Sequence, residues 1–183
     1  MTRRHRLKVN KAEASRRQLE TAIILYFDYG DPVSIHSLAA AAHQVLEDLY
    51  ARNGGKTPMN ATLVAHLPPA LAQAIRAATR QPQNFFKHGN RDPDDLLEFT
   101  PELTEVVLLD AIMTYGRLTN DIPWLFDAFA KWFGLHHPSW YGGVPAWEDL
   151  LESARQYLGP PDRRAFLRQY RESLDRVSPE AAG

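Results

Sequence analysis

The stretch RRQLETAIILYFDYGDPVSIHSLAAAAHQVLEDLYARNGG, residues 16–55, contains two amphipathic patterns separated by a short polar turn. In its first half, apolar side chains recur at the i, i+3, i+4, i+7, i+8 spacing that marks one face of a helix. These side chains are Leu19, Ala22, Ile23, Tyr26 and Phe27. Only Tyr29 and Gly30 separate this helix from the next one, so we predict an antiparallel helical hairpin.

The second helix of this hairpin has clear start and stop signals. Asp31 can cap its first turn, and Pro32 fits the first helical position. Gly54-Gly55 is expected to end it, because glycine adopts the left-handed cap conformation without a side-chain clash. Its apolar stripe comprises Ile35, Leu38, Ala42, Leu46 and Leu49.

The same helical periodicity continues through the rest of the chain. A helix resumes near Ala70, and Pro82 should end or kink it because proline lacks the amide donor. Thr100-Pro101-Glu102 starts a further helix, and a shorter aromatic one, IPWLFDAFAKWF, is closed by Gly134. Residues 135–145 are expected to form a loop, with two further helices at 146–158 and 161–177. The helix that resumes near Ala70 is expected to carry the apolar residues Leu71, Ala74, Ile75 and Ala78. The helix that starts at Thr100-Pro101-Glu102 is expected to bury Val107, Leu108, Ala111, Ile112 and Tyr115.

This pattern, without strand-like alternation, predicts an all-α fold. We expect a helical bundle of about four longer helices with additional short helices at the C-terminal end. We expect this bundle to form a single domain over residues 1–183, with a basic N-terminal arm (about 1–12) and a disordered tail (about 178–183).

The composition is that of an ordinary globular protein. Hydrophobic residues make up 44% of the chain and charged residues 23%, and the formal net charge is −1. Cysteine is absent, which excludes disulfides, iron–sulfur ligation and a thiol nucleophile. No stretch has the ~20 apolar residues of a membrane span, and the basic N-terminus lacks the apolar segment of a signal peptide. We expect a soluble cytoplasmic protein with no membrane partner and, because the usual cofactor motifs are missing, no cofactor.

The segment QNFFKHGNRDPDD, residues 83–95, carries the densest chemistry. Asn84 and His88 are four residues apart, so they lie on one helical face. A structural interpretation treats the segment as a helix end with phenylalanine anchors, a histidine near the negative end of the helix dipole and a polar turn. The other interpretation places a functional site here.

The functional interpretation comes from a resemblance. The residues QNFFKH resemble the motif of the HEPN superfamily of small helical nucleotide-binding and RNase domains: an arginine, a polar residue, three variable residues and a histidine. Asn84 and His88 match this motif, whereas Gln83 stands where the family has arginine. The NFFKH block is also similar to one in small bacterial helical proteins, a likeness that implies no activity.

The resemblance implies a site formed by His88, Asn84 and Lys87. In an RNase of this kind, histidine would transfer protons at the ribose 2′-hydroxyl and arginine would stabilise the phosphate. Gln83 cannot supply that charge, although Lys87, Arg80 or Arg91 could replace it. The preferred function is therefore a HEPN-like binding or interaction protein with a degenerate motif, without efficient catalysis. An active, metal-independent ribonuclease is the alternative.

The same resemblance implies a homodimer, since HEPN domains form symmetric dimers with the motif near the interface. The aromatic surplus, Trp124, Phe129, Trp132 and Trp140, also favours a dimer. A protein or an RNA partner is possible in addition.

Two further histidines lie on the second helix. His36 and His43 are a heptad apart and are candidates for binding, although both can instead be half-buried and hydrogen-bonded within the bundle. Their ~10.5 Å separation along the axis is too long for one shared metal. His43 and Glu47, with His88 or Asp94 from elsewhere, could form a metal site in a helical bundle, which is a third interpretation.

Charge is distributed unevenly along the chain. The first seventeen residues contain seven arginines and lysines against one glutamate, and such an arm can contact phosphates or simply be solvated. An acidic run follows His88 and is expected to repel an RNA backbone. It comprises Asp92, Asp94, Asp95, Glu98, Glu102, Glu105 and Asp110.

Overall fold

The computed structural model describes residues 6–58, 69–90, 93–138 and 162–177. All regular secondary structure in these ranges is helical, which confirms the predicted all-α class. The helices are α1 (Lys11–Phe27), α2 (Pro32–Arg52), α3 (Pro69–Lys87), α4 (Leu103–Thr119), α5 (Trp124–His136) and α7 (Arg163–Val177). Among the described residues, no helix is both long and apolar enough to cross a membrane.

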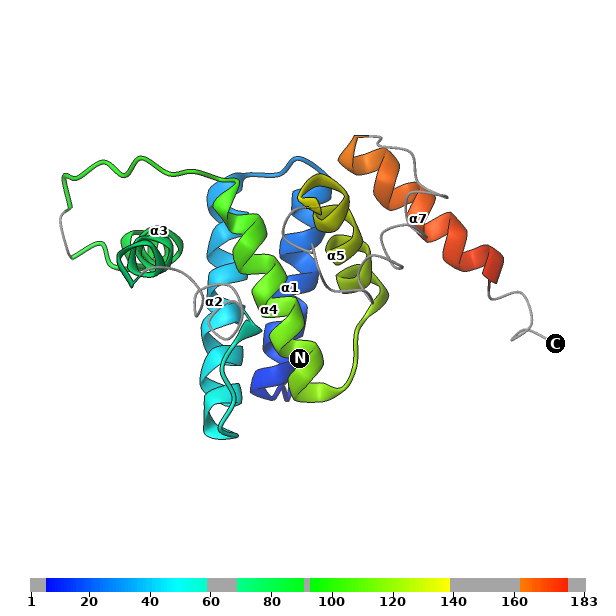
Figure 1. The fold of residues 1–183 in the computed structure, drawn as a ribbon, viewed down its shortest axis with the longest axis horizontal. Coiled ribbons are helices and arrows are strands. Elements are labelled where there is room, and N and C mark those ends of the chain that lie inside the picture. Colours follow the sequence, from blue (N-terminus) through cyan, green and yellow to red (C-terminus); the bar gives the residue numbers. More distant parts are fainter. Residues whose placement is uncertain (1–5, 59–68, 91–92, 139–161, 178–183) are drawn as a thin grey trace, which may run out of the picture.

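The core of the fold is the bundle formed by α1, α2 and α4 (Figure 1). α1 and α2 form the predicted antiparallel hairpin, joined by residues 28–31. The Asp31 carboxylate accepts a hydrogen bond from the Ser34 amide and Pro32 occupies the first turn, as the sequence predicted. Gly54 adopts a left-handed conformation (φ 77°) just after α2. The predicted core face of α1 is buried throughout.

α4 lies against α2 and buries all five of the apolar residues predicted for it. Its C-terminus is closed by Asn120 in a left-handed conformation, with the Asn120 amide donating to the Gly116 carbonyl. α5 adds Phe126, Phe129 and Phe133 to the core. α7 lies at the far end of the molecule, where it contacts α1 and α5 (Figure 1).

α3 is seen nearly end-on in Figure 1, so it crosses the bundle at a steep angle. It contacts α2 and α4, and residues 93–100 lead from its far side back to the start of α4. The helix does not end at Pro82 but continues to Lys87. The last turn is held by tertiary contacts: Gln83 donates to the Ala40 carbonyl, and Phe86 packs edge-on against His36. These contacts offset the hydrogen bond that proline removes.

The end of α5 differs from the prediction. Gly134 does not close the helix, which continues to His136, and His137 is the C-cap rather than part of a loop. His136 stacks on Trp132, one turn earlier, with ring centroids 3.8 Å apart. This stacking stabilises the helical turn that follows Gly134, where glycine itself favours a helix end. Residues 139–161, which include Trp140 and the helix predicted at 146–158, lie outside the described residues.

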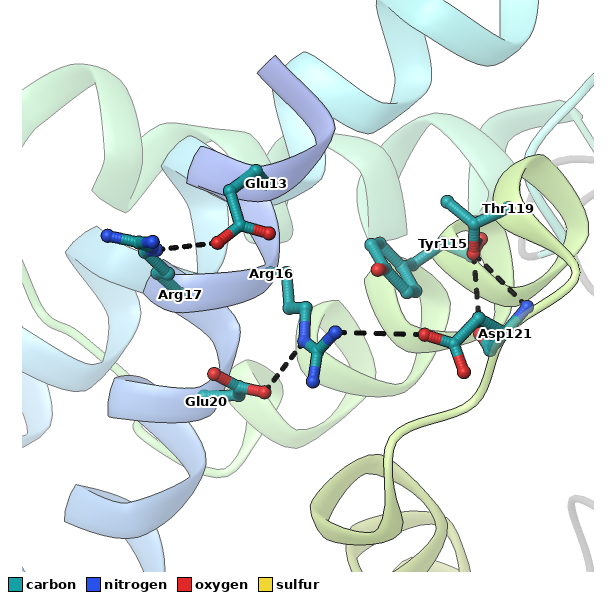
Figure 2. A network of polar contacts seen from close by, with 7 residues as sticks. All are labelled: Glu13, Arg16, Arg17, Glu20, Tyr115, Thr119 and Asp121. Carbon is teal, nitrogen blue, oxygen red and sulfur yellow. Dashed lines mark hydrogen bonds and ion pairs between the residues drawn. The ribbon is translucent and has the colours of Figure 1, made fainter. Parts of the chain in front are cut away.

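A surface network attaches the turn between α4 and α5 to α1. Figure 2 shows Arg16 between Glu20, 2.9 Å from the guanidinium Nε, and Asp121, 3.8 Å from Nη1. Exposed pairs of this kind contribute at most about 1 kcal/mol each. The network therefore makes at most a small contribution to holding the turn against α1.

Candidate functional site

One face of α3 lines an open groove. Asn84 and His88, predicted to share a face, both line it, and so do Arg76 and Arg80 from the two preceding turns. The four residues follow one another at four-residue intervals, so the helix itself aligns them. Phe85 lies beside them, partly exposed. The groove has a volume of about 590 Å³, and Asp95, Leu96 and Leu97 line its opposite wall.

Gln83 lies on the other side of the helix. Its side chain is buried and donates from Nε2 to the Ala40 carbonyl at 3.1 Å. The position where the HEPN motif has arginine therefore faces the bundle and cannot present a cation to the groove. Lys87 is exposed but does not line the groove, and Arg91 lies outside the described residues.

Arg80 is fixed in place by a carboxylate of α2. Its Nη2 atom lies 3.0 Å from both carboxylate oxygens of Glu47. This pair offsets part of the positive charge of Arg80, and it also orients the guanidinium at the edge of the groove. It gives Glu47 a partner other than the metal ion that the sequence allowed for.

His43 pairs with a buried aspartate. Its Nε2 atom lies 2.6 Å from Oδ2 of Asp110, whose side chain is almost completely buried on α4. His43 and Glu47 thus bind different partners, and Asp94 is exposed on the segment after α3. Within the described ranges, no group of three histidine or carboxylate side chains could hold a metal ion.

His36 is fully buried, so it does not line the groove. Its Nδ1 atom lies 2.9 Å from Thr104 Oγ1, and its ring packs edge-on against Phe86 and Phe99. Its Nε2 atom has no hydrogen-bond partner among the described residues. Burial lowers the pKa of His36 from 6.5 to about 4, because desolvation disfavours the charged ring.

We expect this histidine to make the fold sensitive to mild acid. Between about pH 6.5 and 4 the unfolded chain binds a proton at His36 and the folded chain does not, so stability falls as pH falls through this window. At about 1.4 kcal/mol per pKa unit, the full loss is about 3 kcal/mol. Urea unfolding of wild type and His36→Gln at pH 7, 5.5 and 4.5 measures it. The wild type should lose more stability than the variant, and parallel pH profiles would contradict the prediction.

The acidic run predicted after His88 is only partly a surface feature. Asp94, Asp95, Glu98 and Glu102 are exposed, but Glu105 and Asp110 are buried on α4. The expected repulsion of an RNA backbone therefore applies to these four exposed carboxylates, of which Asp95 lines the groove, and not to Glu105 and Asp110. The reason is geometric: α4 begins at Leu103, and a helix turns some of its positions towards the core.

Glu105 is the centre of a buried network that the sequence did not reveal. Its Oε1 atom accepts from the Tyr26 hydroxyl at 2.6 Å, and its Oε2 atom lies 2.8 Å from His137 Nε2. Arg163 Nη2 lies 3.4 Å from Oε1. The Trp132 indole donates to the Tyr26 hydroxyl at 2.9 Å. Burial, together with the bond to the Glu105 carboxylate, raises the pKa of Tyr26 above its ordinary value.

This network joins α1, α4, the end of α5 and α7. Its members lie as far apart in the chain as Tyr26 and Arg163, so no local motif connects them. The one signal in the sequence was a glutamate at a position of α4 that also lies on its apolar face.

Comparison of the chain with protein-family models, curated proteins and solved structures gave no match. The HEPN resemblance therefore rests on residues 83–88 and the helical pattern, and it stays a prediction.

Proposed function

We propose that this chain is a HEPN-like helical binding protein whose ligand groove follows the outer face of α3. The proposed ligand carries phosphate groups and an aromatic base, as a nucleotide or a single strand of RNA does. The protein binds this ligand without cleaving it efficiently.

The observation that carries the proposal is the row formed by Arg76, Arg80, Asn84 and His88 in one groove. Guanidinium groups bind phosphate oxygens with charge-assisted hydrogen bonds, and the amide and imidazole supply further polar contacts. Phe85 offers a ring on which a base can stack, the usual way in which proteins hold unpaired bases. The volume of the groove lies within the ~300–1,000 Å³ typical of ligand pockets.

The same geometry supports binding more than cleavage. Arg80 precedes His88 by eight residues, which separates their backbones by about 12 Å along the helix axis. This spacing suits contacts distributed along a ligand better than convergence on one scissile bond. Gln83, which replaces the motif arginine, is buried. Loss of a comparable transition-state donor costs about 10²–10³ in rate.

A ribonuclease remains the second candidate function. It is favoured by one observation: Arg80 lines the same groove as Asn84 and His88, so a substitute cation is present. In that case His88 would be the proton-transfer group. The homodimer implied by the HEPN resemblance and a protein partner also remain proposals.

We expect the purified chain to bind a short fluorescein-labelled single-stranded RNA at low salt, and Arg80→Ala to weaken this binding about tenfold. The reason is the loss of a charge-assisted contact with phosphate. Fluorescence anisotropy titrations measure the affinity. The matched control is Lys87→Ala, which removes another exposed cation from the same helix but outside the groove. It should change the affinity less than twofold, about the error of such a titration.

Two outcomes would contradict the proposal. Equal weakening by Arg80→Ala and Lys87→Ala would show that the affinity comes from non-specific electrostatic attraction. No binding at low salt would exclude RNA as the ligand. Gel analysis of the same RNA, incubated in EDTA with wild type and His88→Ala, separates the two functions. Efficient cleavage that His88→Ala abolishes would establish the ribonuclease instead.

A further inference from the structure

A separate pocket of about 240 Å³ lies at the opposite end of α2 from its glycine cap, where three parts of the chain meet. These are the turn between α1 and α2, the start of α4 and the start of α7. The apolar part of its lining comes from Tyr29, Pro32, Ile35 and Pro101. The proposed RNA or nucleotide groove shares none of these residues. The pocket therefore needs its own explanation.

Arg163 provides a fixed positive charge in this pocket. Its guanidinium lies 3.9 Å from the centre of the Tyr26 ring and 5.4 Å from that of Tyr29, and Nη2 contacts the buried carboxylate of Glu105. The side chain is thus ordered before a ligand arrives, which lowers the entropic cost of binding. Its Nε and Nη1 atoms have no hydrogen-bond partner in the described part of the chain, and such planar donors fit a carboxylate.

Glu102 provides a negative charge in the same lining. Its carboxylate is exposed and makes no hydrogen bond or ion pair with any described residue, and it does not cap α4. A simple anion in the pocket would meet the carboxylates of Glu102 and Glu105, and a simple cation would meet Arg163. A ligand that carries both charges has a partner for each.

Thr104 adds an oriented hydroxyl group. It lines the pocket, and the fully buried His36 holds its oxygen from behind at 2.9 Å. The other nitrogen of His36, Nε2, has no hydrogen-bond partner in the part of the chain that the structure describes. An unpaired buried nitrogen destabilises the fold, and a role in a functional site is one explanation for its presence. We regard His36 as a positioning residue for Thr104.

We propose that this pocket binds a small zwitterion, an α-amino acid with an apolar side chain. Its carboxylate pairs with Arg163, its ammonium group pairs with Glu102, and its side chain packs on Ile35 and Pro32. The Thr104 hydroxyl hydrogen-bonds to the bound carboxylate. This site is independent of the function proposed for the α3 groove.

Calorimetric titration of the full chain with L-isoleucine, N-acetyl-L-isoleucine and L-isoleucinamide tests this. We expect L-isoleucine to bind, and each derivative, which lacks one of the two charges, to bind at least about tenfold more weakly. Glu102→Gln should weaken L-isoleucine about tenfold and abolish the preference over the N-acetyl form. Glu98→Gln, which removes an exposed carboxylate outside the pocket, should leave both unchanged.

The proposal fails if L-alanine, L-isoleucine and L-phenylalanine all show no binding at millimolar concentration. It also fails if Glu102→Gln, confirmed as folded by circular dichroism, binds L-isoleucine as tightly as wild type. Amide chemical shifts locate the site: changes at Tyr29 and Thr104 support the pocket, whereas changes confined to Asn84 and His88 would assign the ligand to the α3 groove.

Discussion

Replacing Glu105 by alanine is expected to lower the free energy of unfolding by about 3 kcal/mol or more. The carboxylate accepts from the Tyr26 hydroxyl and contacts Arg163 and His137. Its removal leaves a guanidinium and a buried hydroxyl without their acceptor, and breaking a buried pair from one side costs about 3–5 kcal/mol. Arg163 and His137 are partly exposed and can regain water, which places the expected loss near the lower end. Urea unfolding followed by circular dichroism measures it.

The neighbouring Glu102→Ala is the matched control. It removes an exposed carboxylate from the same helix start, one without a partner among the described residues, and should change stability by no more than about 0.5 kcal/mol. Glu105→Gln keeps the size of the side chain and one acceptor oxygen, so its loss in the free energy of unfolding should lie between those of Glu105→Ala and Glu102→Ala. Equal effects of Glu105→Ala and Glu102→Ala would show that the network contributes nothing to stability.

The helices of the core could be predicted because the sequence signals that define them lie within or next to each helix. The spacing of Leu19 and Phe27 defines one face of α1, and Asp31 and Pro32 define the start of α2, whatever the rest of the chain does. Where a helix continues past a predicted end, tertiary packing overrode a local signal. Pro82 and Gly134 both favour helix ends, yet contacts made by the following turns keep α3 and α5 helical beyond them.

The candidate site was likewise predictable only in part from the sequence. Four-residue spacing was enough to place Asn84 and His88 on one face, and both line the groove. It could not show that Gln83 faces α2, because which side of a helix meets the bundle depends on how α3 crosses it. The partners of His43 and Glu47 were also hidden, since Asp110 and Arg80 come from other helices.

The pocket near Arg163 could not be predicted from any pattern in the sequence. Tyr26, Glu102 and Arg163 come from three helix ends, and only the docking of α7 brings the arginine to the other two. The position of α7 is therefore a condition for the proposed amino-acid site. What holds α7 there is a question of aromatic packing.

Replacing Phe166 by alanine is expected to cost about 3–5 kcal/mol, the usual range for a fully buried phenylalanine. The ring stacks on Phe27 with centroids 5.8 Å apart and meets Trp132 edge-on at 5.1 Å. Most other side chains of α7 are exposed or half-buried, and Tyr170 is the second buried anchor. Urea unfolding measures the loss.

Arg168→Ala, an exposed change on the same helix, is the control and should stay within about 0.5 kcal/mol of wild type. If Phe166→Ala were equally neutral, α7 would be an appendage and not part of the core. The expected loss has a functional consequence, because undocking of α7 withdraws Arg163 from Tyr26 and Glu105. L-Isoleucine binding should then weaken in Phe166→Ala, although Phe166 does not line the pocket. RNA binding at the α3 groove should persist under conditions where the variant is still folded.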